Sequence, residues 1–358
     1  MTHANMENNK NSIRIPKQLT FTEPSHLSTF LDANSNVTFL DLHKQQWLEW
    51  KMLRYPTKNK SKVDFLAEYY SLSEFAGNFF YYPWRNQLVR IIDQPKFLDV
   101  VTNRNKHKIT AEEQEVLLTK KVGVVGLSVG RTVSTTIAME KICGELRVAD
   151  FDELDLSNLN RIKAPIFDLG ELKTTSLSRE ISEIDPYFEL TCYSEGLTAN
   201  NINDFFSSGS QLDLVIDECD DLGMKVLIRK KAKEMGIPVL MDTSDRGMLD
   251  IERYDLDPNL HYFHGRIGDF DPPYTWRPLP EERMGLFSKI LDISQLSKRG
   301  QHSLTEIGKS ISTWPQLASA VVAGGGNCTE VARRILLGEK VPSGRFFMDT
   351  ETLIANES

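Results

Sequence analysis

The chain has 358 residues, a formal net charge of -8 and 40% hydrophobic residues, which is typical of a soluble protein with one large domain or two smaller ones. No apolar run approaches the roughly 20 residues that cross a bilayer, and the polar N-terminus lacks the apolar centre of a signal sequence. We therefore expect a cytoplasmic protein with no membrane partner, and its mild acidity argues against nonspecific nucleic-acid binding.

The first hundred residues differ in composition from the rest of the chain. Residues 1–18 are rich in Asn, Lys and Thr without periodicity, which predicts a disordered tail. Residues 19–100 contain three segments with helical spacing and an aromatic run at 75–84. We predict a small, mostly helical cap, followed by a main domain over residues 101–358. We expect the aromatic run to be a packing anchor against the main domain, and a ligand surface is the alternative.

The main domain begins with a strand, a turn and a helix. Val122–Val125 is the short apolar run of a parallel strand that is buried on both faces. Gly126 and Gly130 mark the turn, helical spacing runs from Arg131 to Lys141, and Glu145–Ala149 is a second strand. Because the first amides of a helix lack internal partners and the helix dipole is positive there, this turn can bind phosphate.

The turn alone does not identify the nucleotide. Ser128 stands where a dinucleotide fingerprint has its second glycine, so the turn is a weak signal for NAD. Glycines that serve only backbone geometry would also explain it. Asp150 follows the second strand, where a carboxylate can accept hydrogen bonds from the ribose of NAD or of ATP.

Polar residues farther along the chain favour ATP. Asn158, Arg161 and Lys173 supply an amide and two cations, and Asp220 belongs to an acidic cluster after an apolar run at 212–216. Hydride transfer needs no such set. Attack on a triphosphate needs cations that absorb developing charge and a carboxylate that holds Mg²⁺.

These residues, in this order and spacing, resemble the ThiF/MoeB-type adenylyltransferases of the ubiquitin-activating-enzyme-like superfamily. The matching residues are Gly126 and Gly130, Asp150 and Asp152, Ser157–Arg161, Gly170–Lys173 and Asp217–Asp220. More narrowly, the chain resembles the MoeY-like bacterial branch, in which such a domain can be fused to a nitroreductase-like domain that we do not expect here.

The resemblance implies a role for each matching residue. Asp150 holds the ribose, Arg161 and Lys173 act on the phosphates, and Asp220 binds Mg²⁺. The residues expected to contact the nucleotide are Gly126, Ser128, Gly130, Arg131, Asp150, Asp152 and Asn158. For Arg131, a solvated side chain in the first helical turn is the alternative.

The family also uses an arginine upstream of the first strand, which can act within or between subunits. Arg104, in the basic segment 103–108, is our candidate, and a solvated linker is the alternative.

Cysteine usage excludes part of the family's chemistry. The four cysteines Cys143, Cys192, Cys219 and Cys328 are scattered and form no Cys-x-x-Cys pair. We therefore expect no zinc and no covalent enzyme intermediate. Cys328, which follows Gly324–Asn327, is the one cysteine in a loop-like setting and is the candidate for a reactive thiol.

The rest of the chain alternates between helix and strand. Helices are predicted near 171–184, 199–206 and 224–235, and strands near 188–192, 212–216, 238–241 and 249–253. This alternation predicts an α/β fold with a Rossmann-like doubly wound, mostly parallel sheet and helices on both faces. Asp245 and Arg246 follow a strand and are candidates for substrate contact or for a simple polar turn. Two helices, near 314–322 and 327–337, are predicted to close the chain.

The function we predict is attack of a substrate carboxylate on the α-phosphate of ATP, which releases pyrophosphate and forms an acyl adenylate. The carboxylate could belong to a ubiquitin-like sulfur carrier, a peptide or a small molecule, and the resemblance implies a homodimer. Nucleic acid is not expected as a partner, except a tRNA substrate that meets a basic segment such as 58–62. One alternative is a nucleotide-binding sensor or scaffold. The other is an NAD-dependent oxidoreductase, an activity that would give no role to Asn158, Arg161, Lys173 and Asp220.

Overall fold

The computed structural model describes residues 15–55 and 60–355, which form two compact units. The first unit extends to Ala111 and includes Ile181–Tyr187, and the second comprises Glu112–Glu180 and the chain from Phe188 onward. Most of the predicted disordered tail, and part of the basic segment 58–62, lie outside the described residues.

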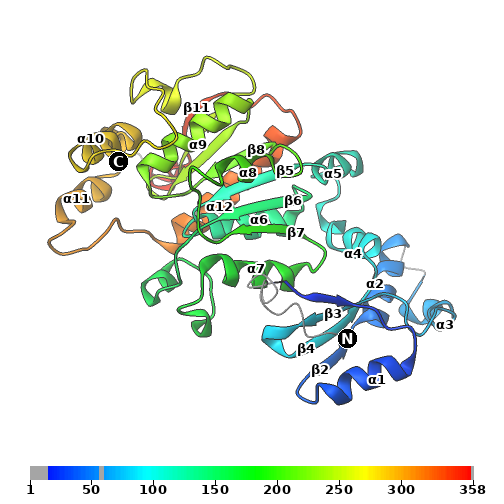
Figure 1. Ribbon diagram of the computed structural model, residues 1–358. Coiled ribbons are helices and arrows are strands. Elements are labelled where there is room, and N and C mark those ends of the chain that lie inside the picture. Colours follow the sequence, from blue (N-terminus) through cyan, green and yellow to red (C-terminus); the bar gives the residue numbers. More distant parts are fainter. Residues whose placement is uncertain (1–14, 56–59, 356–358) are drawn as a thin grey trace. The chain divides into compact units, whose positions relative to one another are not determined.

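The second unit is built on a seven-stranded sheet with the strand order β11-β10-β9-β8-β5-β6-β7 (Figure 1). Its strands are β5 (Lys121–Val125), β6 (Glu145–Ala149), β7 (Glu189–Tyr193), β8 (Leu214–Asp217), β9 (Val239–Thr243), β10 (Met248–Glu252) and β11 (Gly344–Phe347). The five strands from β5 to β9 run parallel to one another, β10 pairs antiparallel with β9, and β11 pairs antiparallel with β10. The structure thus confirms the predicted doubly wound, mostly parallel sheet.

Helices cover both faces of this sheet (Figure 1). The helices that follow the first unit along the chain are α5 (Ala111–Leu117), α6 (Gly130–Glu140), α7 (Lys173–Ile184), α8 (Ile202–Ser207), α9 (Leu222–Met235), α10 (Pro280–Leu291), α11 (Lys298–Glu306), α12 (Ala318–Leu336) and α13 (Thr350–Leu353). Helices α6 and α12 pack against each other, and α8 packs against α9. The core around α8 and α9 includes Phe205, Phe206, Leu227, Met241 and Phe263, each at most 1% exposed.

Strand β5 lies at the point where the chain reverses direction across the sheet. Its neighbours are β6 on one side and β8 on the other. The chain runs from β5 to β6 on one side and from β8 to β9 on the other, so the connections that leave β5 and β8 diverge. In open α/β sheets, ligands bind at the carboxyl ends of the strands at this switch point. The topology therefore places the glycine turn after β5 and the acidic segment after β8 at one edge.

Helix α12 corrects the prediction of two separate helices and a loop. Ala318–Leu336 is one continuous helix that includes all three glycines at 324–326. A Cβ at Gly324 would lie 2.1 Å from Asp242 Oδ2, and one at Gly325 would lie 2.7 Å from Thr132 Cγ2. These glycines let the helix approach β9 and α6 closely, so they are packing residues and do not break the helix.

The first unit contains a four-stranded sheet that the sequence did not predict. Its strands are β1 (Lys17–Leu19), β2 (Thr38–Asp41), β3 (Asn78–Tyr82) and β4 (Gln87–Ile91), in the order β1-β3-β4-β2. Its helices are α1 (Pro24–Ala33), α2 (His43–Arg54), α3 (Leu66–Tyr70) and α4 (Gln94–Val101). Helices still account for more of this unit than strands do. The end of the predicted tail falls within β1.

The aromatic run at 75–84 forms β3 and the start of the turn that follows it. Side chains alternate along a strand, so Phe79 packs with Phe21, while Phe80 and Tyr82 pack with Ile91 on the other face. Pro83–Arg85 forms a 3₁₀ turn into β4. Both faces of β3 are thus buried within the first unit, which accounts for the density of aromatic residues.

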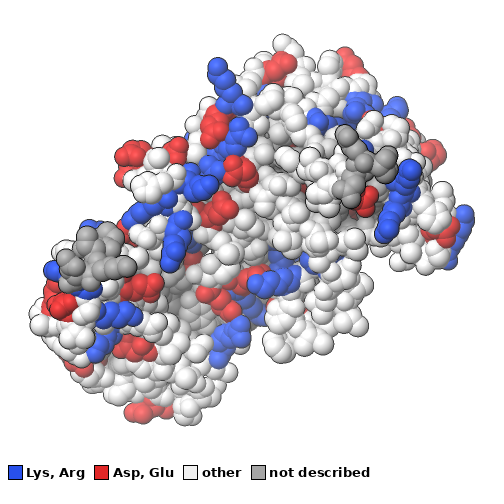
Figure 2. Space-filling view, turned by 180° about the vertical axis from the view of Figure 1, so that it is seen from behind, with Lys and Arg blue, Asp and Glu red and all other residues white. Residues whose placement is uncertain are grey.

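Short 3₁₀ helices complete the two units, at Lys62–Phe65, Pro83–Arg85, Asn103–Asn105, Leu156–Asn160, Ile166–Asp168, Tyr262–Gly265 and Ile293–Gln295. In the part of the chain that the structure describes, no helix combines the length and the apolar character needed to cross a membrane. Lys and Arg side chains are interspersed with Asp and Glu on the face shown in Figure 2.

Candidate functional site

A cavity of about 180 Å³ lies at the carboxyl ends of β5, β6 and β8, where the fold predicts a ligand site. Its walls come from residues 125–128 after β5, 149–152 after β6, 196–197, 218–221 after β8, Met224 and Arg277. Most of the predicted nucleotide-contacting residues lie in these segments. The sheet edge thus gathers residues that are far apart in the sequence.

The glycine turn is tightly packed against the segment after β8. Gly126 has a φ of +88°, and a Cβ there would lie 2.5 Å from the backbone oxygen of Glu218. A Cβ at Gly130 would lie 2.7 Å from Val124 Cγ1. Both positions therefore require glycine for close approach, and Gly126 also requires it for its backbone conformation. Ser128 lines the cavity between them.

Asp150 fixes the geometry of this turn. Its Oδ2 accepts a hydrogen bond from the Leu127 amide at 2.6 Å, and its Oδ1 accepts one from the Asp152 amide at 2.8 Å. Burial raises the pKa of Asp150, while the nearby charge of Lys173 opposes the rise. Each carboxylate oxygen keeps a second lone pair for a ligand hydroxyl, and Asp150 lines the cavity.

Lys173 connects the turn to the segment after β6. It is the first residue of α7 and is 4% exposed. Its Nζ forms an ion pair with Asp152 Oδ2 at 2.7 Å and donates a hydrogen bond to Ser128 Oγ at 3.3 Å. An ammonium group is therefore held against two residues of the cavity wall.

Asn158 and Arg161 lie in and after the 3₁₀ helix Leu156–Asn160. Asn158 is buried, and its Oδ1 accepts a hydrogen bond from the Asp155 amide at 3.1 Å, which fixes the start of this helix. Arg161 donates from Nη1 to Asn160 Oδ1 at 2.9 Å, and its Nε is buried without a hydrogen-bond partner among the described residues. Burial lowers the pKa of Arg161, and the negative charge of Asp220 opposes this effect.

The acidic segment after β8 divides into structural and exposed residues. Asp217 is fully buried and pairs with Arg229 Nη1 at 2.5 Å and with Lys225 Nζ at 3.3 Å. Asp221 accepts a hydrogen bond from the Met224 amide at 2.6 Å and caps α9. Asp220 is exposed and lines the cavity. Among the described residues, Asp220 is the one of these three carboxylates that lines the cavity and makes no hydrogen bond to the protein.

Part of the chain is similar in sequence to a known protein family. Residues 102–246 match the ThiF family model. The chain contains a ThiF-family domain. This confirms the resemblance to ThiF/MoeB-type proteins, and the narrower MoeY-like assignment stays a prediction.

Three relatives show how far the similarity extends. The chain is 42% identical over 283 residues to the uncharacterized protein MT1398 of Mycobacterium tuberculosis, covering 79% of this chain and 39% of that protein. It is 33% identical over 128 residues to tRNA threonylcarbamoyladenosine dehydratase 2 of Saccharomyces cerevisiae, covering 35% and 28% of the two chains. It is 29% identical over 115 residues to adenylyltransferase and sulfurtransferase UBA4 of Kluyveromyces lactis, covering 31% and 25%. The chain therefore spans 39% or less of the length of each of these relatives.

Some residues predicted for the site of the ThiF domain lie elsewhere. Arg131 was predicted at the phosphates or in solvent, but it is 3% exposed and does not line the cavity. Its Nη2 forms an ion pair with Glu180 at 2.7 Å, and its Nη1 donates to Ser176 Oγ at 3.0 Å. Arg131 therefore joins α6 to α7. Arg104 is exposed in the first unit, and its proposed role remains a prediction.

The candidates after β9 are also structural. Asp245 accepts hydrogen bonds from the amide and the hydroxyl group of Ser297 at 2.8 and 2.6 Å. Arg246 forms an ion pair with Asp349 at 2.7 Å. These contacts connect the turn after β9 to the C-terminal helices, and neither residue lines the cavity.

Cys328 is not in a loop. It lies in α12 and is 0% exposed, and burial raises the pKa of its thiol. A buried thiol with a raised pKa is a poor nucleophile, so the loop-like setting that made Cys328 a candidate for a reactive thiol is not found. Cys219 lines the cavity, but burial first and the Asp217 charge second raise the pKa of its thiol.

Sequence reasoning missed several residues of the cavity wall. Arg277 reaches the cavity from the proline-rich segment between β10 and α10, where no motif marks it. Phe151 is 69% exposed on the wall, beside Gly196, where a Cβ would lie 2.7 Å from its ring. Glu218 was read only as part of an acidic run. Only the packing of β8 against β9 shows that its carboxylate is buried within the cavity wall.

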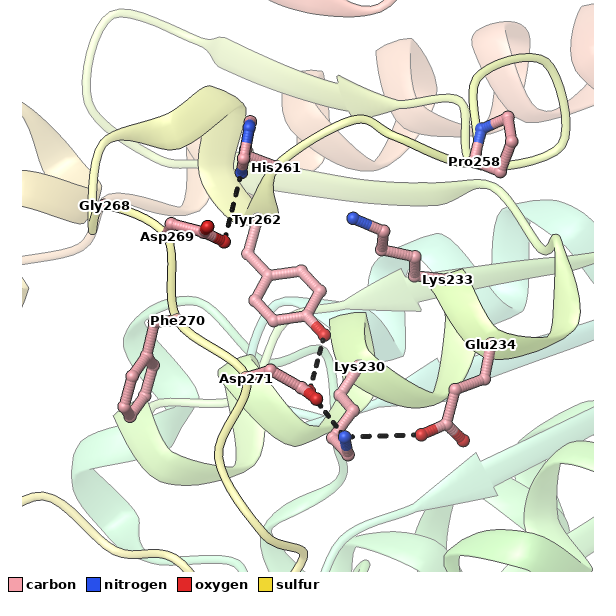
Figure 3. A pocket seen from close by; sticks show the side chains of 10 residues that line it. All are labelled: Lys230, Lys233, Glu234, Pro258, His261, Tyr262, Gly268, Asp269, Phe270 and Asp271. Atoms are coloured by element: carbon pink, nitrogen blue, oxygen red, sulfur yellow. Dashed lines mark hydrogen bonds and ion pairs between the residues drawn. The ribbon is translucent and has the colours of Figure 1, made fainter.

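A second, larger cavity is lined in part by Lys230, Lys233 and Glu234, which lie in the second half of α9 (Figure 3). Its volume is about 440 Å³. Several of its polar groups pair with one another. Lys230 pairs with Asp271 and Glu234, and Tyr262 donates to Asp271 at 3.5 Å. It lacks the switch-point position and the glycine turn, so we place the functional site at the sheet edge.

Proposed function

We propose that the chain is an Mg²⁺-dependent, ATP-dependent adenylyltransferase that activates a carboxylate as an acyl adenylate. The observation that supports this proposal is the convergence of the glycine turn, Asp150 and Asp220 around one cavity at the switch point, with Lys173 and Arg161 beside it. The ThiF-family match over residues 102–246 agrees with it.

The arrangement suits a nucleotide in one orientation. Asp150 would accept hydrogen bonds from the ribose hydroxyl groups, and the turn at the N-terminus of α6 would face the phosphates. Lys173 lies next to Ser128 of that turn. The ribose and the phosphates would therefore be held by the segments after β6 and β5.

The charge of the cavity explains why the reaction would need a divalent ion. Five carboxylates line it, namely Asp150, Asp152, Glu218, Asp220 and Asp221, with a single guanidinium, that of Arg277. A triphosphate entering such a wall needs additional positive charge close to its oxygens. Mg²⁺ and the side chains of Lys173 and Arg161 would supply it.

Asp220 is the carboxylate best placed to hold that ion. In the described part of the chain, no three His, Cys, Asp or Glu side chains converge in a group that could hold a metal. Mg²⁺ is commonly bound by one or two carboxylates together with substrate phosphates and water. Exposed Asp220 fits such a site, which would be complete only when the nucleotide is bound.

In the proposed reaction, a carboxylate oxygen of the substrate attacks the α-phosphorus. The bond from that phosphorus to the bridging oxygen breaks, and the electron pair leaves with pyrophosphate. Lys173 and Arg161 would stabilise the charge that develops on the phosphate oxygens. No acid or base is required from the protein in this step, because the attacking carboxylate is already ionised.

Several classes of substrate fit this proposal. UBA4 is named as an adenylyltransferase and sulfurtransferase, and another relative as a dehydratase of tRNA threonylcarbamoyladenosine. We propose a ubiquitin-like carrier, a peptide, a small carboxylate or a tRNA-borne carboxylate as the substrate. We also propose a cytoplasmic homodimer. The buried Cys328 and the raised thiol pKa of Cys219 favour transfer without a covalent enzyme intermediate.

ATP–pyrophosphate exchange tests this function. We expect exchange of labelled pyrophosphate into ATP that depends on a carboxylate substrate and on Mg²⁺, and that is abolished by Lys173→Ala. The control is Lys231→Ala on α9, a position outside the cavity wall. ATP binding without exchange, across carrier C-termini, peptides and small acids, would identify a sensor. NAD binding in place of ATP would identify an oxidoreductase.

A further inference from the structure

The wall of the nucleotide cavity includes one residue from outside the ThiF match. Arg277 belongs to the segment between β10 and α10, beyond residues 102–246. In the described part of the chain, it is the one lining residue with a cationic side chain, whereas five lining residues are acids. The segment that follows the family domain therefore contributes the positive charge of this wall.

Arg277 is carried by residues 271–278, which we call the strap and which lie along α9. At the start of the strap, Asp271 forms an ion pair with Lys230 (Figure 3). Three residues later, the hydroxyl group of Tyr274 donates a hydrogen bond to Glu234 Oε2 at 2.6 Å. Two polar contacts thus attach the strap to the second half of α9.

The other end of the strap packs against the start of α9. A Cβ at Gly223 would lie 3.2 Å from Cδ of Arg277 and 3.2 Å from Cδ of Pro278. The ring of Trp276 packs edge-on against that of Phe270, with 5.0 Å between the centroids, and both rings contact the core around α8 and α9. Packing therefore holds the aliphatic stem of Arg277 in place beside the cavity, which lowers the cost of ordering it when a ligand binds.

The guanidinium group of Arg277 is available to a ligand. The side chain is exposed, and its Nη1 donates a hydrogen bond to the carbonyl oxygen of Trp276 at 2.7 Å. Within residues 15–55 and 60–355, no carboxylate forms an ion pair with it. A guanidinium group has five N–H donors in a planar fork that matches the two oxygens of a carboxylate. Most of these donors are uncommitted in Arg277.

Two anions would enter the cavity, the nucleotide phosphates and the substrate carboxylate, and their positions differ. The glycine turn follows β5, which lies between β6 and β8. Lys173 is on the β6 side, where it contacts Ser128 of the turn and Asp152 after β6. Arg277 is on the β8 side, where it contacts Gly223 at the start of α9. Phosphates over the turn would therefore use Lys173, which leaves Arg277 for the second anion.

An anionic substrate on the β8 side needs such a cation. Asp220 and Asp221 line the cavity there, and like charges repel strongly in a partly enclosed site. Mg²⁺ held by Asp220 would be shared with the phosphates. Arg277 would offset the remaining repulsion and would bind the carboxylate through two parallel hydrogen bonds.

We propose that Arg277 binds the attacking carboxylate of the substrate and holds it beside the α-phosphate. This inference rests on the proposed function. A carboxylate oxygen forms the bond to the α-phosphorus, and the bond from that phosphorus to the bridging oxygen breaks, with its electron pair leaving on pyrophosphate. The fork of Arg277 fixes the direction of attack, because it orients the carboxylate before the reaction.

The inference can be tested without knowing the natural substrate. Acetate is the probe, because it is a carboxylate with little else to recognise. The protein is first saturated with Mg²⁺ and an ATP analogue in which a methylene group replaces the oxygen between the α- and β-phosphorus, so that no pyrophosphate is released. Saturation-transfer NMR then measures acetate binding, and calorimetry measures the affinity for the analogue separately.

We expect the nucleotide complex of the wild-type protein to bind acetate at millimolar concentration. Arg277→Gln should weaken acetate binding about tenfold or more, because charge-assisted hydrogen bonds are lost. Arg277→Lys should retain part of the affinity, since an ammonium group keeps the charge but not the fork. The control is Arg283→Gln, an exposed position on α10 that does not line the cavity, and it should match the wild-type protein. The affinity for the ATP analogue should be equal in all four proteins.

The exchange assay gives a second readout. With a carboxylate that supports pyrophosphate exchange, Arg277→Gln should raise the KM for that carboxylate by about 10- to 100-fold and leave the KM for ATP unchanged. A purely structural role of Arg277 would change both values together. Because Arg277 is exposed, its variants should keep the wild-type thermal denaturation midpoint.

Four results would contradict this account. Equal acetate binding by the wild-type protein and Arg277→Gln overturns the inference, and so does the absence of acetate binding by the wild-type nucleotide complex. If Arg277→Gln binds the ATP analogue more weakly and acetate normally, Arg277 serves the phosphates and the inference is wrong. In these three cases the proposed function stands. If the wild-type protein binds neither ATP nor the analogue, the proposed function itself is contradicted.

Discussion

Asp242, a largely buried acid in β9, makes the stability of this protein depend on pH in a specific direction. The pKa of Asp242 is about 7 in the folded protein, compared with 3.8 for an ordinary aspartate. The folded state therefore binds this proton more tightly than the unfolded state does. The associated stabilisation is fully present below about pH 4 and is lost as the pH rises through about 7.

The size of the effect follows from these two values. One pKa unit corresponds to about 1.4 kcal/mol, so full ionisation of Asp242 in place costs at most about 4 kcal/mol. Asparagine has nearly the same shape and carries no charge. Asp242→Asn should therefore unfold with a free energy about 2 to 4 kcal/mol higher than that of wild-type protein at pH 8, and the difference should shrink towards zero near pH 4.

Urea denaturation of both proteins at several pH values measures this difference. The control is Asp269→Asn, whose carboxylate has a side-chain exposure of 95%. It should change the free energy of unfolding by less than about 0.5 kcal/mol at every pH. If Asp242→Asn is less stable than wild-type protein at pH 8, or if its effect does not vary with pH, the assignment of a raised pKa at Asp242 is wrong.

Three further predictions concern the glycines and the proposed metal ligand. Gly324→Ala should lower the free energy of unfolding by about 1 to 3 kcal/mol, because its Cβ would lie 2.1 Å from Asp242 Oδ2, whereas Gly326→Ala has nothing within 4 Å and should raise it by up to about 1 kcal/mol. Equal thermal denaturation midpoints for these two variants would contradict the packing explanation. Gly126→Ala should cost about 2 to 4 kcal/mol and weaken ATP binding, because it combines a φ of +88° with a backbone overlap at Glu218, and unchanged ATP affinity by calorimetry would refute this. Asp220→Ala should reduce pyrophosphate exchange by about 10² to 10³ with little change in thermal stability, and full exchange would remove Asp220 from the metal site.

The sequence predicted the sheet of the second unit because its signals are local. Strands such as Val122–Val125 are short apolar runs, and the glycine turn marks the change from strand to helix. Asp150 and Asp220 follow strands in the sequence, and parallel strands bring their carboxyl ends to one edge. These features need no knowledge of distant contacts, and observed strands β5 and β6 end at the predicted residues.

The errors occurred where packing between distant segments decides the outcome. Gly324–Gly326 resembled a loop because glycine weakens an isolated helix, yet contacts with Asp242 and Thr132 favour glycine in α12. Arg131 was predicted near phosphate or solvent, and only the fold shows that Glu180 on α7 neutralises it. The hydrogen bond from the backbone amide of Asp242 to Glu218 Oε1 depends on the β8–β9 register, which no local pattern specifies.

The central claim is that the cavity at the carboxyl ends of β5, β6 and β8 binds ATP with its phosphates over the glycine turn. A crystal structure of the full chain with ATP and Mg²⁺ tests it most directly. We predict the ribose on Asp150, Mg²⁺ between Asp220 and the phosphates, and Lys173 and Arg161 within hydrogen-bond distance of phosphate oxygens. A nucleotide bound elsewhere, with Lys173 still paired only to Asp152 and Ser128, would contradict the account.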